Sequence, residues 1–368
     1  MVRTPLALPD FPWDALVPYG KIAHTHPDGF VDLSVGSPVD PTPHIIRETL
    51  ASATDAHAYP TTTGTVQLRE AIVEWFDRRR GVPSLTVDNV LPTVGSKELV
   101  ALLPLLLGLG KDDVVVHPSV AYPTYAIGAA MVGATAVATD DPAQWPENTA
   151  LVWLNSPGNP DGRVADVEQL RAAVERAREL GAVIASDECY AELNWNGPDP
   201  TPSILDPAVI GTDRSSVLAV YSLSKQSNLA GYRAAFVAGC SALISELLAV
   251  RKHAGLIVPG PVQEAMVTAL RDEAHVAHQR ELYRARRAKL LPALARAGFH
   301  IDDSLAGLYL WATKNEDSWQ TVGDLAHSGI LVVPGSFYGE EPARHVRIAL
   351  TASDETIADA VARLELLS

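Results

Sequence analysis

The chain has 368 residues, 47% hydrophobic and 20% charged, which is ordinary for a globular protein and long enough for two domains. The formal net charge of −15 disfavours nucleic acid as a partner, and the arginine-rich stretches 77–81 and 284–289 are interpreted as solvated helix faces. Two cysteines, Cys189 and Cys240, give neither a disulfide framework nor metal-ligand spacing, so we expect a cytoplasmic protein without a metal site.

The first part of the chain does not predict membrane targeting. Residues 1–20 lack the continuous apolar core of a signal peptide. The most apolar run, residues 99–110, is too short to span a membrane and contains Pro104. This run predicts a buried helix instead, and we expect no membrane partner.

From residue 66 to residue 224, helical and strand-like patterns alternate. Residues 66–80 and 166–180 carry apolar side chains at helical spacing, and Asp166 is placed to cap the second helix. Four apolar runs predict strands that are buried on both faces: residues 113–117, 150–154, 181–188 and 215–224. The alternation predicts an α/β fold with a large domain, whose mostly parallel sheet is covered by helices.

The pattern changes after about residue 255. A long helical stretch over residues 262–298 precedes three short strands and a last helix, at residues 307–313, 330–335, 345–351 and 354–367. These elements predict a smaller α+β domain. We therefore expect an N-terminal arm with part of the small domain, a large domain, and a small C-terminal domain, at residues 1–35, 36–255 and 256–368.

Ligands of open α/β sheets bind beyond the carboxyl ends of the strands, so polar residues there are candidates for a site. Gly95 permits a tight turn and Ser96 then opens a helix, whose first backbone N–H groups suit a phosphate. The alternative is an ordinary serine N-cap. No Walker loop and no G-x-G-x-x-G sequence follows a strand, which weakens a nucleotide or NAD interpretation.

Three further predicted strand ends carry candidate residues. Tyr122 could stack on a heteroaromatic ring or be a partly exposed loop tyrosine. Asn159, in the tight loop NSPGNPDG, could aim its amide at a ligand, although a structural turn explains most of that loop. Asp187 ends a buried strand, where a carboxylate needs a partner such as an arginine or a protonated ring nitrogen; a structural aspartate is the alternative. Tyr190 could reach the same ligand as Asp187.

The stretch VYSLSKQSNLAGYR, residues 220–233, places Lys225 where a buried strand ends. Loss of solvation there would lower the pKa of the lysine and make its amine nucleophilic, as a Schiff base requires; a surface lysine on a turn is the alternative. Ser222 and Arg233 lie close by in sequence, and arginine suits a phosphate dianion. Arg347 points away from the apolar face of its strand, where it could bridge an acid or grip a carboxylate.

One ligand, pyridoxal 5′-phosphate (PLP), accounts for this whole set. PLP needs an amine for its aldehyde, cations and N–H groups for its phosphate, and a carboxylate for its ring nitrogen. It also needs hydrogen-bond partners for its phenolic oxygen and an aromatic side chain on which to stack. The strand ends offer each of these groups.

Several motifs resemble those of the class I/II aminotransferases of PLP fold type I, over nearly the whole chain. The most specific is SLSK followed by an arginine eight residues after the lysine. SDECY matches the family's D-x-x-Y, and NSPGNPDG keeps the second asparagine of N-P-x-N-P-T-G but departs from that motif at Ser156 and Asp161. Other similar segments are residues 33–40, 59–64, 332–339 and 345–350.

The resemblance implies a role for each candidate residue. Lys225 is expected to bind the cofactor through an imine and move the proton at Cα, while Asp187 keeps the pyridine nitrogen protonated. Tyr190 and Asn159 would bond the phenolic oxygen, and Tyr122 would stack on the ring. The phosphate would be held by Ser96, Lys97, Ser222 and Arg233, with Tyr59 contributed across the interface of a homodimer. The substrate α-carboxylate would be bound by Arg347, with Gly36 and Asn159 assisting.

The substrate is less clear from the sequence than the reaction. The family uses glutamate as a common amino donor, and PTVGSKE resembles N-succinyldiaminopimelate aminotransferases of lysine biosynthesis. A distal carboxylate on such a substrate would need a second cationic side chain to bind it. The candidates are Lys97, Lys21, His24 and His26. The alternatives are an aminotransferase for another amino acid and a PLP-dependent C–S β-lyase. A PLP-binding regulator would need an added DNA-binding domain, for which the chain has neither the length nor the basic charge.

Overall fold

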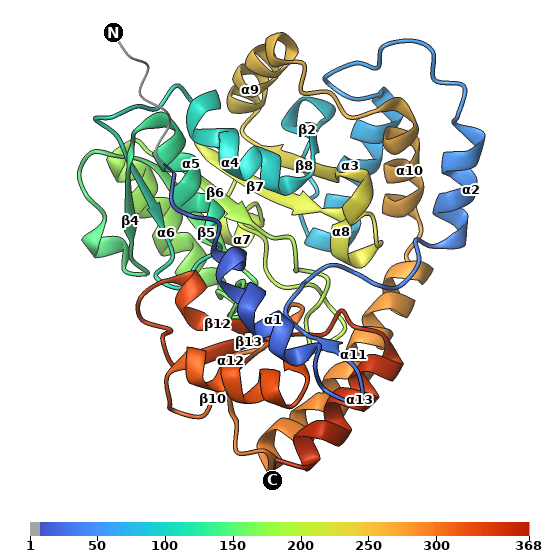
Figure 1. Cartoon of the computed structure of the whole chain (residues 1–368). Helices are drawn as coiled ribbons and strands as arrows, with labels where there is room; N and C mark the ends of the chain where they lie inside the picture. The colour runs from blue at the N-terminus through green and yellow to red at the C-terminus, as the bar shows by residue number, and fades with distance from the viewer. Residues whose placement is uncertain (1–7, 368) are drawn as a thin grey trace, which may run out of the picture.

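A seven-stranded sheet forms the centre of the computed structural model, which describes residues 8–367 (Figure 1). Its strand order is β2 (Val90–Val94), β8 (Ala234–Gly239), β7 (Val217–Ser222), β6 (Val183–Asp187), β5 (Thr149–Asn155), β3 (Val114–His117) and β4 (Thr135–Ala138). Only β8 runs antiparallel to its neighbours, so the sheet is mostly parallel. The predicted fold class is confirmed, and the four predicted strands are β3, β5, β6 and β7.

Helices cover both faces of this sheet because its inner strands are apolar on both sides. On β7, Val217 and Tyr221 face one layer, whereas Leu218 and Val220 face the other. The first layer consists of α3 (Val66–Arg80), α6 (Val167–Leu180) and α10 (Gly260–Arg271). The second consists of α4 (Ser96–Leu106), α5 (Thr124–Val132) and α9 (Ser241–Ala254). The apolar run that contains Pro104 is therefore a buried helix, as predicted.

The ends of the covering helices follow local capping rules. The Asp166 side chain accepts a hydrogen bond from the Gln169 N–H and caps α6, as the sequence predicted. Gly181 ends the same helix at φ 68°, in the left-handed region that favours glycine.

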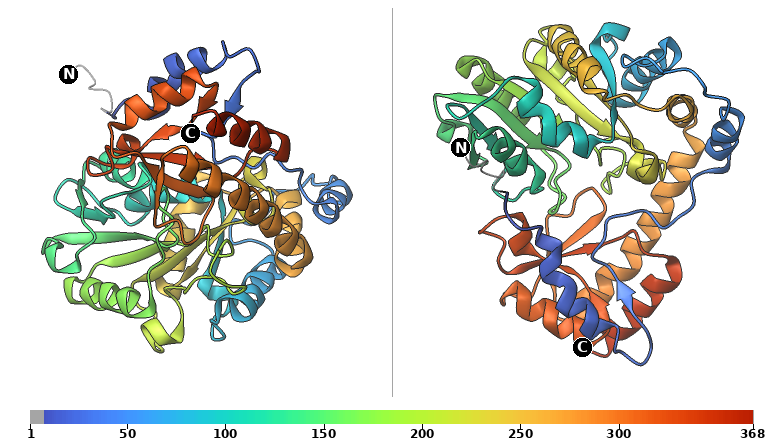
Figure 2. Two further views of the ribbon diagram at one scale, coloured as in Figure 1. Left: turned by 90° about the horizontal axis from the view of Figure 1, so that it is seen from below. Right: turned by 45° about the horizontal axis from the view of Figure 1, so that its top comes forward.

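A second, four-stranded antiparallel sheet lies beside the carboxyl edge of the first. Its order is β12 (Val333–Pro334), β13 (His345–Ala349), β10 (Tyr309–Thr313) and β9 (His300–Asp302). One apolar cluster joins it to α11 (Ala274–Arg296), α12 (Ser318–His327) and α13 (Asp354–Glu365). The N-terminal helix α1 (Val17–Ala23) and the short parallel pair β1 (Val31–Asp32) and β11 (Ile330–Leu331) pack on the same side (Figures 1 and 2). The domain boundaries at residues 35 and 255 stay predictions.

Two details of the sequence interpretation were wrong. The helical stretch of residues 262–298 is two helices, because Asp272 is extended between α10 and α11. The arginine-rich stretches are not wholly solvated: Arg80 is 4% exposed, and Arg286 is 2% exposed. Each has an acidic partner, since Arg80 pairs with Glu188 at 2.7 Å and Arg286 pairs with Asp40 at 2.6 Å.

Candidate active site

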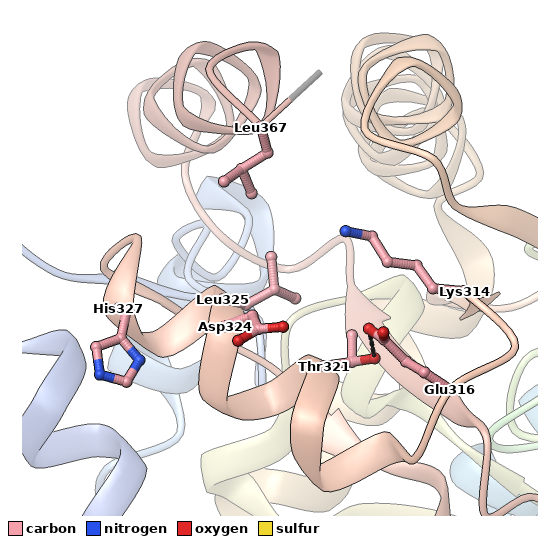
Figure 3. A pocket seen from close by; sticks show the side chains of 7 residues that line it. All are labelled: Lys314, Glu316, Thr321, Asp324, Leu325, His327 and Leu367. Carbon is pink, nitrogen blue, oxygen red and sulfur yellow. Dashed lines mark hydrogen bonds between the residues drawn. The ribbon is translucent and has the colours of Figure 1, made fainter.

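Most of the predicted site residues come together in one cavity of about 1250 Å³ between the two sheets. The predicted residues that line it are Gly36, Ser96, Lys97, Tyr122, Asn159, Asp187, Tyr190, Ser222, Lys225, Arg233 and Arg347. A smaller cavity of about 360 Å³ lies by α12 and the chain end, between Lys314, Asp324 and Leu367 (Figure 3). None of the predicted site residues lines that smaller cavity.

Lys225 lies in a short helix, α8 (Leu223–Gln226), directly after β7. Its ammonium Nζ donates a hydrogen bond to the carbonyl oxygen of Gly36. Burial lowers the pKa of Lys225, and the positive charges of Arg347 and Arg233 add to this effect, while Tyr309 and Cys189 oppose it. The alternative of a surface lysine is therefore wrong, and the amine is placed to act as a nucleophile.

Asp187 ends β6 with its carboxylate buried in the cavity wall. Its Oδ2 accepts from the Tyr125 hydroxyl at 3.1 Å, and its Oδ1 accepts from the Cys189 N–H at 3.2 Å. Burial raises the pKa of Asp187, and its carboxylate has no cationic partner among residues 8–367. A protonated ring nitrogen would supply that partner.

Tyr125 was not among the residues predicted from the sequence. It is fully buried on α5 and stacks on Trp153, with ring centroids 5.1 Å apart. Its ring also lies edge-on against that of Tyr122, at a centroid distance of 5.9 Å, but Tyr122 precedes the first residue of α5, so helical spacing gave no signal for this contact.

An anion site lies where α4 begins. Gly95 has φ 75°, and a Cβ there would lie 2.2 Å from Nη2 of Arg233, so the guanidinium crosses the start of the helix. Ser96 is the first helical residue, and no side chain caps the helix, so the alternative of a serine N-cap is wrong. Ser222 and Ser224 line the same cavity, and the Ser222 hydroxyl donates to that of Ser224 at 2.7 Å. A helix start, a guanidinium and two hydroxyls together suit a phosphate.

Arg347 is a buried cation without an acidic partner among the described residues. Its Nη1 donates to Asn159 Oδ1 at 3.1 Å and its Nη2 to the Ser34 carbonyl at 2.7 Å. Its Nε is buried and has no partner within residues 8–367. This arrangement does not fit the alternative in which Arg347 bridges an acid of the chain, and it leaves the guanidinium able to bind a carboxylate that enters the cavity.

Tyr190 meets a second tyrosine, Tyr309 on β10, which the sequence did not single out. Their hydroxyl oxygens lie 3.3 Å apart. A Cβ on Gly36 would lie 2.0 Å from the Tyr309 hydroxyl, so the glycine makes room for that hydroxyl group. Burial raises the pKa of Tyr190 well above its usual value.

The structure does not bring every predicted residue to the cavity. Tyr59 is 98% exposed and does not line it, so its expected action across a dimer interface stays a prediction. Lys21, His24 and His26 are also absent from the cavity wall. Lys97 does line it, with its Nζ 5.9 Å from the ring centroid of Tyr122. Of the four cations considered for a distal carboxylate, only Lys97 lies in the cavity.

Comparison with known proteins identifies the class to which this fold and site correspond. The family description "Aminotransferase class I and II" matches residues 28–364, so the chain belongs to the class I and II aminotransferases. The chain is 55% identical to a probable aminotransferase of Mycobacterium tuberculosis, over 97% of this chain and 85% of that protein. It is 54% identical to the 4-dedimethylamino-4-oxo-anhydrotetracycline transaminase OxyQ of Streptomyces rimosus, over 97% of this chain and 99% of that protein. It is 32% identical to the LL-diaminopimelate aminotransferase of Aquifex aeolicus, over 92% of this chain and 91% of that protein.

Solved structures agree with this assignment. An aminotransferase from Neisseria meningitidis superposes with a TM-score of 0.89 at 30% identity, over 98% of this chain and 97% of that one. BacF from Bacillus subtilis superposes with a TM-score of 0.88 at 26% identity, over 100% of this chain and 98% of that one. The chain is therefore an aminotransferase that uses PLP, and the cavity offers the groups that this cofactor needs.

Neither a membrane-spanning helix nor a metal-binding cluster is present in the described part of the chain. Within residues 8–367, no helix combines the length and the apolar character that crossing a membrane requires. The same residues contain no group of three or more histidine, cysteine, aspartate or glutamate side chains arranged to hold a metal ion.

Proposed function

We propose that this chain transfers an amino group from an L-amino acid, with glutamate as the common donor, to a keto acid by means of the cavity residues described above. The observation that carries the proposal is the buried Arg347 guanidinium, whose free Nε lies in the wall of the cavity that contains Lys225. Amino and keto acids all carry a carboxylate next to the reacting carbon. A guanidinium without an acidic partner is the group that would bind it.

Lys225, Asp187 and Tyr190 are proposed to act on the reacting centre. When bound, PLP supplies an electrophilic aldehyde and a ring that accepts electrons. Lys225 would bind the aldehyde carbon and later move the proton at the substrate Cα, because its lowered pKa leaves a larger share of its amine unprotonated. Asp187 would hold the proton on the ring nitrogen, and Tyr190 would donate to the phenolic oxygen together with Asn159.

The remaining residues are proposed to position the cofactor and the substrate. Tyr122 would stack on the cofactor ring, and Gly36 and Asn159 would assist Arg347 with the α-carboxylate. The phosphate would be held by Ser96, Lys97, Ser222 and Arg233, with Tyr59 of the partner subunit completing the site in a homodimer. The exposure of Tyr59 on the single chain is compatible with that arrangement.

For the acceptor, we propose the N-succinyl-2-amino-6-ketopimelate and N-succinyl-LL-2,6-diaminopimelate pair of lysine biosynthesis. Support comes from Lys97, a cavity cation that has no ion-pair partner within residues 8–367 and that a distal carboxylate could reach. The relatives point to a wider range, since one is named for LL-diaminopimelate and another for an anhydrotetracycline. A cytoplasmic location stays a prediction.

A substrate panel tests this proposal. PLP-loaded protein is mixed with glutamate and a series of keto acids, including the succinylated pair, and with LL-diaminopimelate and 2-oxoglutarate. We expect the succinylated keto acid to give the highest kcat/KM. Lys97→Ala should lower that value more than it lowers the values for the other acceptors, which lose only the phosphate contact of Lys97. Equal turnover of all acceptors, or an unchanged preference in Lys97→Ala, would reject the proposed acceptor but not the transfer reaction.

The same protein also tests the C–S β-lyase alternative. Lysis of cystathionine releases pyruvate and ammonia without any keto acid, whereas transfer requires one. We expect product to form only when a keto acid is present. Rapid pyruvate release from cystathionine alone would favour the lyase.

A further inference from the structure

Tyr309 is a buried cavity side chain for which neither the sequence motifs nor the family resemblance supplied a role. It contacts three parts of the site: its hydroxyl lies 3.3 Å from that of Tyr190 and against Gly36, and its ring centroid lies 4.0 Å from Cζ of Arg347. It comes from β10, whereas Tyr190 follows β6 and Arg347 lies on β13. Tyr309 therefore touches both the substrate side and the cofactor side of the cavity.

We propose that Tyr309 is a positioning residue that couples the two sides: its hydroxyl donates to Tyr190, and its ring supports the guanidinium of Arg347. The proposal rests on the roles proposed above for Tyr190, Lys225 and Arg347. It adds two separable functions, one for the hydroxyl group and one for the ring.

The direction of the hydrogen bond follows from counting protons. A phenol has one proton to donate, and the 3.3 Å contact allows either tyrosine to be the donor. If Tyr190 donates to the phenolic oxygen of the cofactor, its oxygen can only accept from Tyr309. Tyr309 would then strengthen the bond that Tyr190 makes, because hydrogen bonds in a chain polarise one another.

The charges around Tyr309 favour this donor role. Burial alone would raise the pKa of Tyr309, but the charges of Arg347 and Lys225 and the hydrogen bond with Tyr190 together outweigh it, and the net pKa of Tyr309 is lowered. The pKa of Tyr190 is raised by burial. The more acidic phenol is the better donor, so Tyr309 is suited to donate to Tyr190. The other ionisable groups that interact with Tyr309 are Tyr122, Tyr283 and Tyr338.

The ring of Tyr309 also fixes the orientation of Arg347. Two of the guanidinium nitrogens donate to Asn159 and the Ser34 carbonyl, and Cζ of Arg347 lies over the Tyr309 ring at cation–π distance. Tyr338 is farther from Arg347, at 5.3 Å, and its buried hydroxyl has no hydrogen-bond partner among the described residues. Tyr338 is therefore a control tyrosine for Tyr309, because it lacks both the hydroxyl hydrogen bond and the close ring contact with Arg347.

Three variants separate the two functions: Tyr309→Phe, Tyr309→Leu and Tyr338→Phe. The first measurement is the pH midpoint of the visible absorbance change of PLP-loaded protein without substrate. Hydrogen-bond donors to the phenolic oxygen of PLP stabilise the deprotonated form of the imine between PLP and Lys225. Removing such a donor therefore raises the pH midpoint of the absorbance change. We expect Tyr309→Phe to raise it by about half a unit or more, and Tyr338→Phe to move it much less.

The second measurement is the binding of glutarate, which has the carboxylates of glutamate but no amino group. We expect Tyr309→Leu to weaken glutarate binding about tenfold, because the ring support is lost, and Tyr309→Phe to change it by less than about threefold. If Tyr309→Leu does not fold, the Tyr309→Phe midpoint and its comparison with Tyr338→Phe still decide the hydroxyl role.

The outcomes distinguish this inference from the proposed function. An unchanged midpoint in Tyr309→Phe, or an equal shift in Tyr338→Phe, would overturn the hydroxyl role. Unchanged glutarate binding in folded Tyr309→Leu would overturn the ring role. If the wild-type protein showed no covalent PLP absorbance at all, the roles proposed for Lys225 and the cavity would fail first.

Discussion

The two walls of the cavity differ in how the chain builds them. On the wall formed by the large sheet, Asp187 is the last residue of β6 and Lys225 lies just after β7, so both side chains line the cavity from the carboxyl edge of the sheet. On the wall formed by the small sheet, Tyr309 and Arg347 lie within β10 and β13 and reach the cavity from one face of the strands. The first wall thus places the side chains proposed to react at strand ends, whereas the second places the side chains proposed to bind on one face of its strands.

Replacing Lys225 tests the large-sheet wall and has the largest expected effect. We expect Lys225→Ala to fold but to lose transamination by about 10²–10⁴-fold or more, because both the nucleophile and the proton carrier are removed. The control is Lys252→Ala, which changes an exposed lysine on α9. Near-normal turnover in Lys225→Ala would remove that lysine from the reaction.

Replacing Arg347 tests the small-sheet wall. We expect Arg347→Ala to raise KM by about 10²-fold for every amino and keto acid, since all carry the α-carboxylate. Arg347→Lys should recover little, because an ammonium cannot reproduce the planar fork. Arg344→Ala, an exposed change in the same segment, is the control. An effect on one substrate only would give Arg347 a role in side-chain selection.

The pH dependence of stability tests the environment of Asp187. Its pKa in the folded chain is raised by burial above the ordinary 3.8. At pH values between 3.8 and the raised pKa of the folded chain, the folded state holds more protons than the unfolded state. The free energy of unfolding of the apo protein should therefore fall as pH rises through this range. We expect Asp187→Asn to abolish that loss, so that its Tm relative to wild type increases with pH. Parallel Tm curves for the two proteins would show that Asp187 has an ordinary pKa.

Replacing Tyr59 has the smallest expected effect and tests a contact outside the single chain. Because this side chain is 98% exposed, Tyr59→Phe should leave the Tm of a monomer unchanged. If it binds phosphate across a homodimer, the Kd for PLP should rise about tenfold. Tyr19→Phe is the control. An unchanged Kd together with a dimeric mass would mean that the dimer interface does not use Tyr59.

The same difference between the walls explains what the sequence could predict. Lys225, Asp187, Ser222 and Tyr122 were identifiable because each lies at or soon after the end of a recognisable buried strand, and the fold class follows from the same strands. Tyr309 was not, because a tyrosine inside GLYLWAT looks like any apolar strand residue until the partner across the cavity is known. Tyr125 was missed for a similar reason, since its partner Asp187 is distant in sequence.

Charged side chains show the same limit on sequence interpretation. Arg80 and Arg286 lie in basic stretches that are typical of solvated helix faces, yet both are buried. Their partners, Glu188 and Asp40, are far away in the sequence. Periodicity can locate a helix, but it does not reveal which acid will meet a given arginine in the folded chain. The role proposed for Tyr59 likewise depends on a second subunit.

Covalent trapping at Lys225 is the most direct test of the proposed chemistry. Purified protein is saturated with PLP, reduced with borohydride, digested and analysed by mass spectrometry. We expect one stoichiometric pyridoxyl adduct, on the peptide that contains Lys225. An adduct on Lys97 or another lysine, or no adduct in protein that still transaminates, would contradict the account.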